Sequence, residues 1–260
     1  DLTKLAAYAY HLSGQKEKAW NQIKTLNPST REDYEIMGLL AYEAGFMNEA
    51  IQILEAGFLI HSHEPRLLAA LVSIYVREKK YRQMEFVVEF YQQKNKTDRF
   101  TLWLFQLALT EEKIDRALEL GEKILASDEP KDHAFYYNLG KVYEKKSRFD
   151  LSEKYYLQSK AMAPDFPYPY AALAGLYTAS SRYDLAADHY LVLIKLIPDY
   201  GVYYYQLAQV YSLSESYFLA KEFFKQAVFK GFPRETVLED PLCEPVKKRF
   251  PEFVKELENS

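Results

Sequence analysis

A fixed interval of 34 residues recurs through the second half of this sequence, and it constrains the fold more than any other feature. Three columns carry the same large residue at each recurrence: Tyr136, Tyr170 and Tyr204; Leu139, Leu173 and Leu207; Tyr143, Tyr177 and Tyr211. Two further columns carry only small residues: Gly140, Ala174 and Ala208; Ser152, Ala186 and Ala220. Self-similarity at a fixed period of this length indicates a repeat protein whose similar units stack on one another.

The same phase continues towards the N-terminus. Tyr34 and Gly38 lie 102 residues, or three periods, before Tyr136 and Gly140. The period therefore predicts repeats at about 1–30, 31–64, 65–98, 99–132, 133–166, 167–200 and 201–234. Within 99–132 the phase slips, because Ala117 lies one residue early, so we expect a shortened turn at 110–113 and a lengthened loop at 127–130.

Each repeat is predicted to hold two helices. Apolar residues recur three and four apart in 133–145 and again in 149–162, which is the pattern of helices with a wide apolar face. A single helix pair cannot bury that face, so neighbouring pairs stack. The predicted fold class is all-α, a right-handed α-solenoid superhelix of antiparallel helix hairpins with a concave and a convex surface. In this fold most of the repeated tyrosines are framework residues.

The repeat columns resemble the tetratricopeptide repeat family, whose pattern runs from an aromatic residue, leucine, glycine and tyrosine to alanine, an aromatic residue and a closing proline. The repeat at 167–200 matches almost throughout, with Tyr170, Leu173, Ala174, Tyr177, Ala186, Tyr190 and Pro198. The resemblance extends from residue 1 to about 234 and is strongest in the last three repeats. It implies a scaffold that binds proteins and has no enzymatic activity.

After Pro233 the period stops, and a solenoid that stops must cover its last apolar face. Residues 235–260 offer three short apolar stripes, which predict C-terminal capping helices. This tail is similar to one that closes many tetratricopeptide arrays in bacterial proteins. Cys243, within it, is expected to be a buried small hydrophobic residue.

Composition excludes several classes of function. Lysine plus arginine number 33 against 37 for aspartate plus glutamate, a net charge of -4, so nucleic acid is not an expected partner. No apolar run reaches the roughly 20 residues of a membrane-spanning helix, so no direct membrane insertion is expected. The chain begins with Asp rather than Met, and we expect it to be trimmed from something longer. Its compartment, cytoplasmic or periplasmic, stays open.

No catalytic signature occurs in the sequence, and no phosphate-binding glycine-rich motif. His61 and His63 form the one local histidine pair, but only Glu64 lies nearby as a third ligand, and structural zinc usually has four. We therefore expect no enzyme, no cofactor and no metal site.

The candidate binding site lies along the first helix of each repeat, at its second, fifth, ninth and twelfth residues, which line the concave face in this family. These positions are mixed and charged in the early repeats and aromatic in the later ones. Rigid amphipathic aromatic side chains are favoured at binding surfaces. The predicted peptide-binding residues are Trp103, Tyr137, Lys141, Glu144, Tyr168, Tyr205 and Gln209.

The expected partner is a protein, bound through a peptide or helical segment in this groove. Two alternatives stay open: a self-associating structural subunit of a larger assembly, which includes a homo-oligomer, and the docking region of a longer enzyme whose catalytic domain lies upstream. If Tyr137, Tyr168 and Tyr205 are groove anchors, their replacement by alanine is expected to leave thermal stability nearly intact. Replacement of a framework tyrosine such as Tyr143 or Tyr177 by alanine is expected to cost about 3 to 5 kcal/mol of stability.

Overall fold

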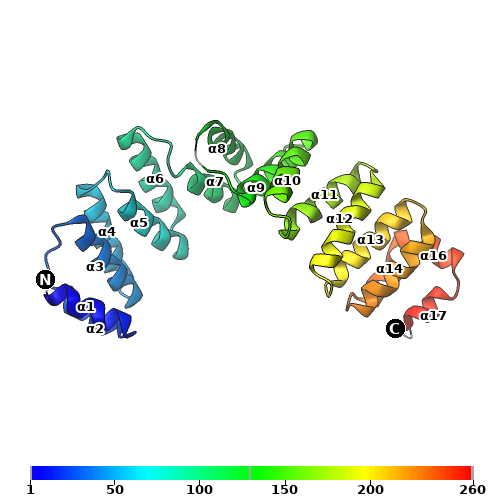
Figure 1. Ribbon diagram of the computed structural model, residues 1–260, viewed down its shortest axis with the longest axis horizontal. Coiled ribbons are helices and arrows are strands. Elements are labelled where there is room, and N and C mark those ends of the chain that lie inside the picture. The colour runs from blue at the N-terminus through cyan, green and yellow to red at the C-terminus, as the bar shows by residue number, and fades with distance from the viewer. Residues whose placement is uncertain (1, 129, 259–260) are drawn as a thin grey trace. The chain divides into compact units, whose positions relative to one another are not determined.

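The computed structural model describes residues 2–128 and 130–258, which are all-α and contain no strand. It divides into two compact units, unit 1 at Asp1–Glu129 and unit 2 at Pro130–Ser260. In both units consecutive helices fold back on one another as hairpins and the hairpins stack (Figure 1), so the predicted α-solenoid class is confirmed.

Unit 1 holds four helix pairs. They are α1 (Leu2–Leu12) with α2 (Lys16–Ile23), α3 (Arg31–Glu43) with α4 (Met47–Ile60), α5 (Pro65–Arg77) with α6 (Tyr81–Asn95), and α7 (Thr101–Thr110) with α8 (Ile114–Ala126). One period before Phe149, the first residue of α10, is residue 115, whereas α8 begins at Ile114. The expected shortening of the turn is wrong, because residues 111–113 between α7 and α8 number three, as do residues 146–148 between α9 and α10. The one-residue slip is already present in α7, which ends at Thr110, 35 residues before the end of α9 at Lys145.

Unit 2 holds three helix pairs and a terminal group of short helices. The pairs are α9 (His133–Lys145) with α10 (Phe149–Met162), α11 (Pro167–Ala179) with α12 (Tyr183–Leu196), and α13 (Gly201–Leu213) with α14 (Tyr217–Phe229). The terminal group is α15 (Arg234–Glu239), the 3-10 helix η1 (Pro241–Cys243), α16 (Glu244–Arg249) and α17 (Phe253–Glu258).

The turn inside each pair repeats one backbone conformation. A residue with positive φ follows the first helix in all seven pairs: Gly14, Gly45, Lys79, Glu112, Ser147, Ser181 and Glu215. The next amide then bonds back into the helix, as when the N–H of Phe46 donates to the carbonyl of Ala41 at 2.9 Å. This left-handed ending satisfies carbonyls that the helix leaves unpaired, and it favours glycine. Only the first two turns have glycine at this position. The other five turns adopt the same conformation with lysine, glutamate or serine.

Repeated tyrosines fill the core of unit 2. Tyr143, Tyr170, Tyr177 and Tyr204 are buried, which confirms their interpretation as framework residues. The phenol groups reach hydrogen-bond acceptors at the edge of the core: the hydroxyls of Tyr170 and Tyr204 donate to the carbonyls of Pro164 and Pro198 at 3.0 and 2.9 Å. A buried tyrosine needs such a partner for its hydroxyl, because burying an unpaired polar group is costly.

The terminal helices cover the last pair of unit 2. Val237, Cys243, Val246, Phe253 and Leu257 are buried in one cluster with Phe224 of α14. Burial raises the pKa of the Cys243 thiol to about 12, so this thiol is not a reactive one. Cys243 is therefore the buried small residue that its sequence context indicates, and the short helices act as a cap on α13 and α14.

Alanine at Gly140 and alanine at Gly175 are expected to change the stability of unit 2 in opposite directions. A Cβ at Gly140 would lie 2.6 Å from the ring of Tyr156, whereas a Cβ at Gly175 meets nothing within 4 Å. Overpacking costs about 1 to 3 kcal/mol, while replacing an open helical glycine gains roughly 0.5 to 1 kcal/mol. Urea unfolding of the two single variants tests this, and equal shifts of the midpoint would contradict the close approach of α9 and α10.

Candidate functional site

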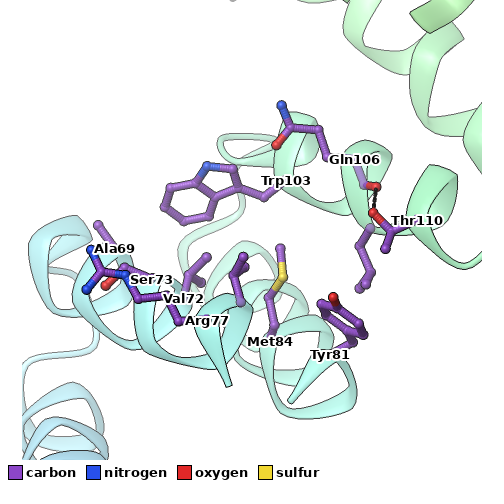
Figure 2. Close-up of a pocket in the computed structure, with 11 residues that line it drawn as sticks. Ala69, Val72, Ser73, Arg77, Tyr81, Met84, Trp103, Gln106 and Thr110 are labelled. Atoms are coloured by element: carbon purple, nitrogen blue, oxygen red, sulfur yellow. Dashed lines mark hydrogen bonds between the residues drawn. The ribbon is translucent and has the colours of Figure 1, made fainter. Parts of the chain in front are cut away.

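A hollow of about 490 Å³ opens in unit 1 between α5, the start of α6 and α7 (Figure 2). Its lining consists of Ala69, Val72, Ser73, Val76, Arg77, Tyr81, Met84, Trp103, Gln106, Leu107 and Thr110. Val72, Met84 and Leu107 are buried at its base, and the half-buried indole of Trp103 lies across from Val72 and Met84. An apolar base with a few polar groups at the rim is the usual character of a site that holds another molecule.

The loop before α7 positions the indole. Phe100 has a φ of 71°, a left-handed conformation that is rare for a bulky residue. Its ring stacks on Trp103 with centroids 4.6 Å apart and meets Tyr91 edge-on at 5.4 Å. The side-chain amide of Gln92 holds the loop by donating to the carbonyl of Arg99 at 2.9 Å. Strain of this kind persists where surrounding contacts enforce it, and here it orients one wall of the hollow.

Arg77 is the one charged residue that lines this hollow. Its guanidinium carbon lies 5.8 Å from the ring centroid of Tyr42, and the Tyr42 hydroxyl donates to Glu78 at 3.0 Å. No carboxylate of residues 2–128 or 130–258 forms an ion pair with Arg77. The guanidinium at the rim therefore keeps its hydrogen-bond donors for an external acceptor, and a carboxylate would match them in geometry and charge.

Six of the seven predicted site residues belong to unit 2, and Tyr137 and Tyr168 lie together there. Their ring centroids are 5.8 Å apart, and Phe166 contacts both rings at 5.8 and 5.0 Å. Tyr168 is 58% exposed, whereas Tyr137 is half-buried and packs on Tyr156. Burial raises the pKa of the Tyr137 phenol. This aromatic cluster has one exposed ring, that of Tyr168, and two rings that support it.

Lys141 and Glu144 flank the same cluster on α9 and are exposed. The Lys141 ammonium lies 5.6 Å from the ring centroid of Tyr137. Glu144 accepts a hydrogen bond from the hydroxyl of the fully buried Tyr156. Glu144 therefore supports the framework of the pair, while Lys141 is a surface charge beside the aromatic rings.

Tyr205 and Gln209 lie against the cap. The Tyr205 hydroxyl donates to Asp240 at 2.7 Å, and its ring stacks on Phe232 with centroids 4.1 Å apart. The side-chain amide of Gln209 donates to the same carboxylate at 2.9 Å. Because of these contacts, alanine at Tyr205 is expected to cost stability, and so is alanine at Tyr137. The expectation of near-neutral substitution thus fits only Tyr168 of the three, and the role of these residues in binding stays a prediction.

Sequence reasoning missed several residues that shape these surfaces. Phe166 precedes α11 and lies outside the helical positions that were counted. Arg77 is the thirteenth residue of the repeat 65–98 and Gln106 the eighth of 99–132. Each lies next to a predicted lining position, the twelfth and the ninth. A count that included both neighbours of each lining position would have found Arg77 and Gln106. Phe166 recurs as an aromatic residue one period later, at Tyr200, but both residues precede the helices to which the count applies.

Within residues 2–128 and 130–258 no three histidine, cysteine or acidic side chains gather where they could hold a metal ion. His63 instead contacts the side chain of Asn95. Over the same part of the chain, no helix has the length and apolar character needed to cross a membrane.

Comparisons with known proteins agree with this architecture. Residues 133–166 match the family model of the tetratricopeptide repeat, and a comparison with curated proteins finds no match. Among solved structures, the C-terminal part of a tetratricopeptide repeat-containing protein from Cytophaga hutchinsonii is 15% identical over 86% of this chain and 94% of that chain, with a TM-score of 0.65. A tetratricopeptide repeat protein from Parabacteroides merdae is 16% identical over 99% and 98%, with a TM-score of 0.56.

A chain of the APC/C hetero-tetramer Cut9-Hcn1 is also similar, with 16% identity over 94% of this chain and a TM-score of 0.52. This chain spans about half of that one, 48% of its length. At these identities the likenesses concern the fold, and they define the class as an α-solenoid of helix hairpins. The family-model match shows that residues 133–166 are a tetratricopeptide repeat, and the helix hairpins of both units have the fold of solved proteins that contain this repeat.

Proposed function

We propose that this chain is a non-enzymatic scaffold that binds a peptide or helical segment of a partner protein along the first helices of its pairs. Tetratricopeptide repeats are generally non-catalytic and bind proteins. The observation that carries the proposal for this chain is the Trp103 hollow, which combines a buried apolar base, an oriented indole and an unpaired guanidinium. The exposed ring of Tyr168 offers a second contact of the same kind in unit 2.

The chemistry of the hollow defines what the partner segment must carry. An apolar side chain inserted beside Trp103 loses its water-exposed surface, which stabilises the complex by about 25 cal/mol for each Å² buried. A carboxylate next to that side chain would accept charge-assisted hydrogen bonds from Arg77. The favoured segment therefore has a large apolar residue flanked by aspartate or glutamate.

Replacing Trp103 by alanine is expected to weaken binding of such segments by about 30-fold or more, because a central aromatic anchor contributes at least about 2 kcal/mol. The measurement is fluorescence polarisation against a library of labelled peptides in which one large apolar residue is flanked either by acidic or by basic residues. The wild-type chain should select the acidic-flanked peptides.

Two further variants separate the parts of this site. Trp103→Phe keeps an aromatic wall and should retain most of the affinity, while Arg77→Glu should reverse the preference between acidic and basic flanks. Far-ultraviolet circular dichroism verifies that each variant is folded. Equal affinity of wild type and Trp103→Ala for every peptide in the library would refute the hollow as the binding site.

A further inference from the structure

A second apolar surface of unit 1 lies on α4 and α6, each of which is the second helix of its pair. We name it the α4/α6 patch, and it comprises Glu55, Leu59, Arg82, Phe86 and Phe90. Four of these residues lie on or beside a hollow of about 350 Å³ whose lining also includes Tyr75, Gln83 and Val87. The Trp103 hollow is lined from α5, α6 and α7 and shares none of these residues, so the two surfaces are distinct.

Large apolar side chains of the patch are exposed rather than packed in the core. Leu59 is 64% exposed and Phe86 is 68% exposed. Phe86 stacks on Phe90 with centroids 6.3 Å apart, and Phe90 meets the buried Phe58 edge-on at 5.9 Å. Phe90 is half-buried and Phe86 is exposed, so the rings lead from the core of α4 and α6 to the surface. Contiguous exposed apolar surface of this kind marks an interaction site more often than a free surface.

The two charges of the patch have opposite signs and neither is neutralised by the chain. Glu55 accepts a hydrogen bond from the hydroxyl of the buried Tyr75 at 2.5 Å, which fixes the carboxylate at the edge of the hollow. Arg82 lines the same hollow. In the part of the chain that the structure describes, no ion pair joins Glu55 to Arg82 or engages either with another residue.

We infer that the α4/α6 patch is the interface with a second copy of this chain. In a two-fold interface each surface contacts its own counterpart, so a patch with one acidic and one basic group beside an apolar centre is complementary to itself. Arg82 of each copy would pair with Glu55 of the other, and Leu59 and Phe86 would lose their exposure between the two pairs. A partner of one charge sign would instead meet a like charge on one side, which is unfavourable.

This inference stands apart from the proposed function, because a dimer through α4 and α6 leaves the Trp103 hollow unoccupied. The test is sedimentation velocity of the full chain over about 1 to 100 µM, because mass action raises the dimer fraction as the concentration rises. The wild-type chain should shift from monomer to dimer as its concentration rises. A chain that stays monomeric over the whole range overturns the inference.

Phe86→Ser is expected to weaken the dimer at least tenfold without unfolding the chain, because the ring is mostly exposed in the monomer. Phe229→Ser is the matched control, since Phe229 is 75% exposed and lies on α14 of unit 2. It should leave the association unchanged. Association that persists in Phe86→Ser, or that is lost only in Phe229→Ser, would place the interface elsewhere and overturn the inference.

The charge pair provides an independent test. Arg82→Glu and Glu55→Lys should each oppose self-association, because each brings like charges together twice in the two-fold interface. An equimolar mixture of the two variants should recover dimer, because the mixed dimer restores both opposite-charge pairs. If Glu55→Lys fails to fold for lack of its bond with Tyr75, Arg82→Glu alone remains decisive. A mixture of folded variants that stays monomeric, or an Arg82→Glu chain that dimerises like wild type, contradicts the inferred pairing.

Discussion

Replacing Tyr156 by alanine is expected to lower the free energy of unfolding of unit 2 by about 3 to 5 kcal/mol. The ring is fully buried and packs on Tyr137 with centroids 5.7 Å apart, and it also fills the space beside Gly140. Alanine would leave a cavity at the contact between α9 and α10, and the Glu144 carboxylate would lose its hydrogen bond from the phenol. The midpoint of urea unfolding, followed by circular dichroism, measures the loss.

Two variants separate the causes of that loss. Tyr156→Phe keeps the ring and removes only the hydroxyl, so it should cost roughly 1 kcal/mol. Tyr168→Ala removes a ring that is 58% exposed and should cost less than about 1 kcal/mol. If Tyr168→Ala were as damaging as Tyr156→Ala, the exposed ring would be a core residue and its assignment to a binding surface would be wrong.

The helices could be predicted because the same packing contacts recur at the 34-residue period of the sequence. The spacing of Tyr136, Tyr170 and Tyr204 sets where first helices begin, and the small column at Gly140 marks where two helices approach closely. A Cβ at Gly140 would lie within 2.6 Å of Tyr156, so the small residue is a physical requirement of the hairpin. The same column carries Ala174 and Ala208 in the next two pairs, so this requirement leaves a periodic signal.

The turns and the site were harder to predict because their residues follow no period. The left-handed turn conformation is carried by Gly45 in one pair but by Lys79 and Glu215 in others, since local hydrogen bonds impose it on several residue types. Trp103 lies where the phase slips, and its orientation depends on the strained backbone of Phe100. Neither the strain nor the stacking has a signature in a single sequence.

Tyr205 illustrates a different limit. Tyr205 lies 68 residues, or two periods, after Tyr137, so the two residues occupy the same position of their repeats. Periodicity therefore assigns both to the same surface. In the structure the pair that contains Tyr205, α13 with α14, is followed by the cap rather than by another helix pair, and Asp240 and Phe232 lie against the Tyr205 side chain. The last repeat of an array has a different neighbour from the others, and a periodic count does not contain that information.

Replacing Asp240 by alanine is expected to destabilise the cap by about 3 kcal/mol and to release it from α13. The carboxylate accepts three hydrogen bonds: from the Tyr205 hydroxyl at 2.7 Å, from the Gln209 amide at 2.9 Å and from the Leu242 backbone N–H at 2.9 Å. Asp240 itself is buried, so the substitution leaves the Tyr205 hydroxyl and the Leu242 N–H without this acceptor, while the Gln209 amide keeps the Tyr205 oxygen at 3.1 Å. Hydrogen exchange of the amides in 237–253 should accelerate more than exchange in α11 and α12.

The control is an exposed aspartate of the same unit whose ion pair lies at the surface. Asp199 pairs with Lys230 at 2.8 Å on the surface, and Asp199→Ala should leave both the unfolding midpoint and the exchange of the cap unchanged. Because Tyr205 donates to Asp240, the effects of Tyr205→Phe and Asp240→Ala should be less than additive in the double variant. Additive losses would show that the Tyr205 hydroxyl and the Asp240 carboxylate are not coupled, which would contradict the role assigned to their hydrogen bond.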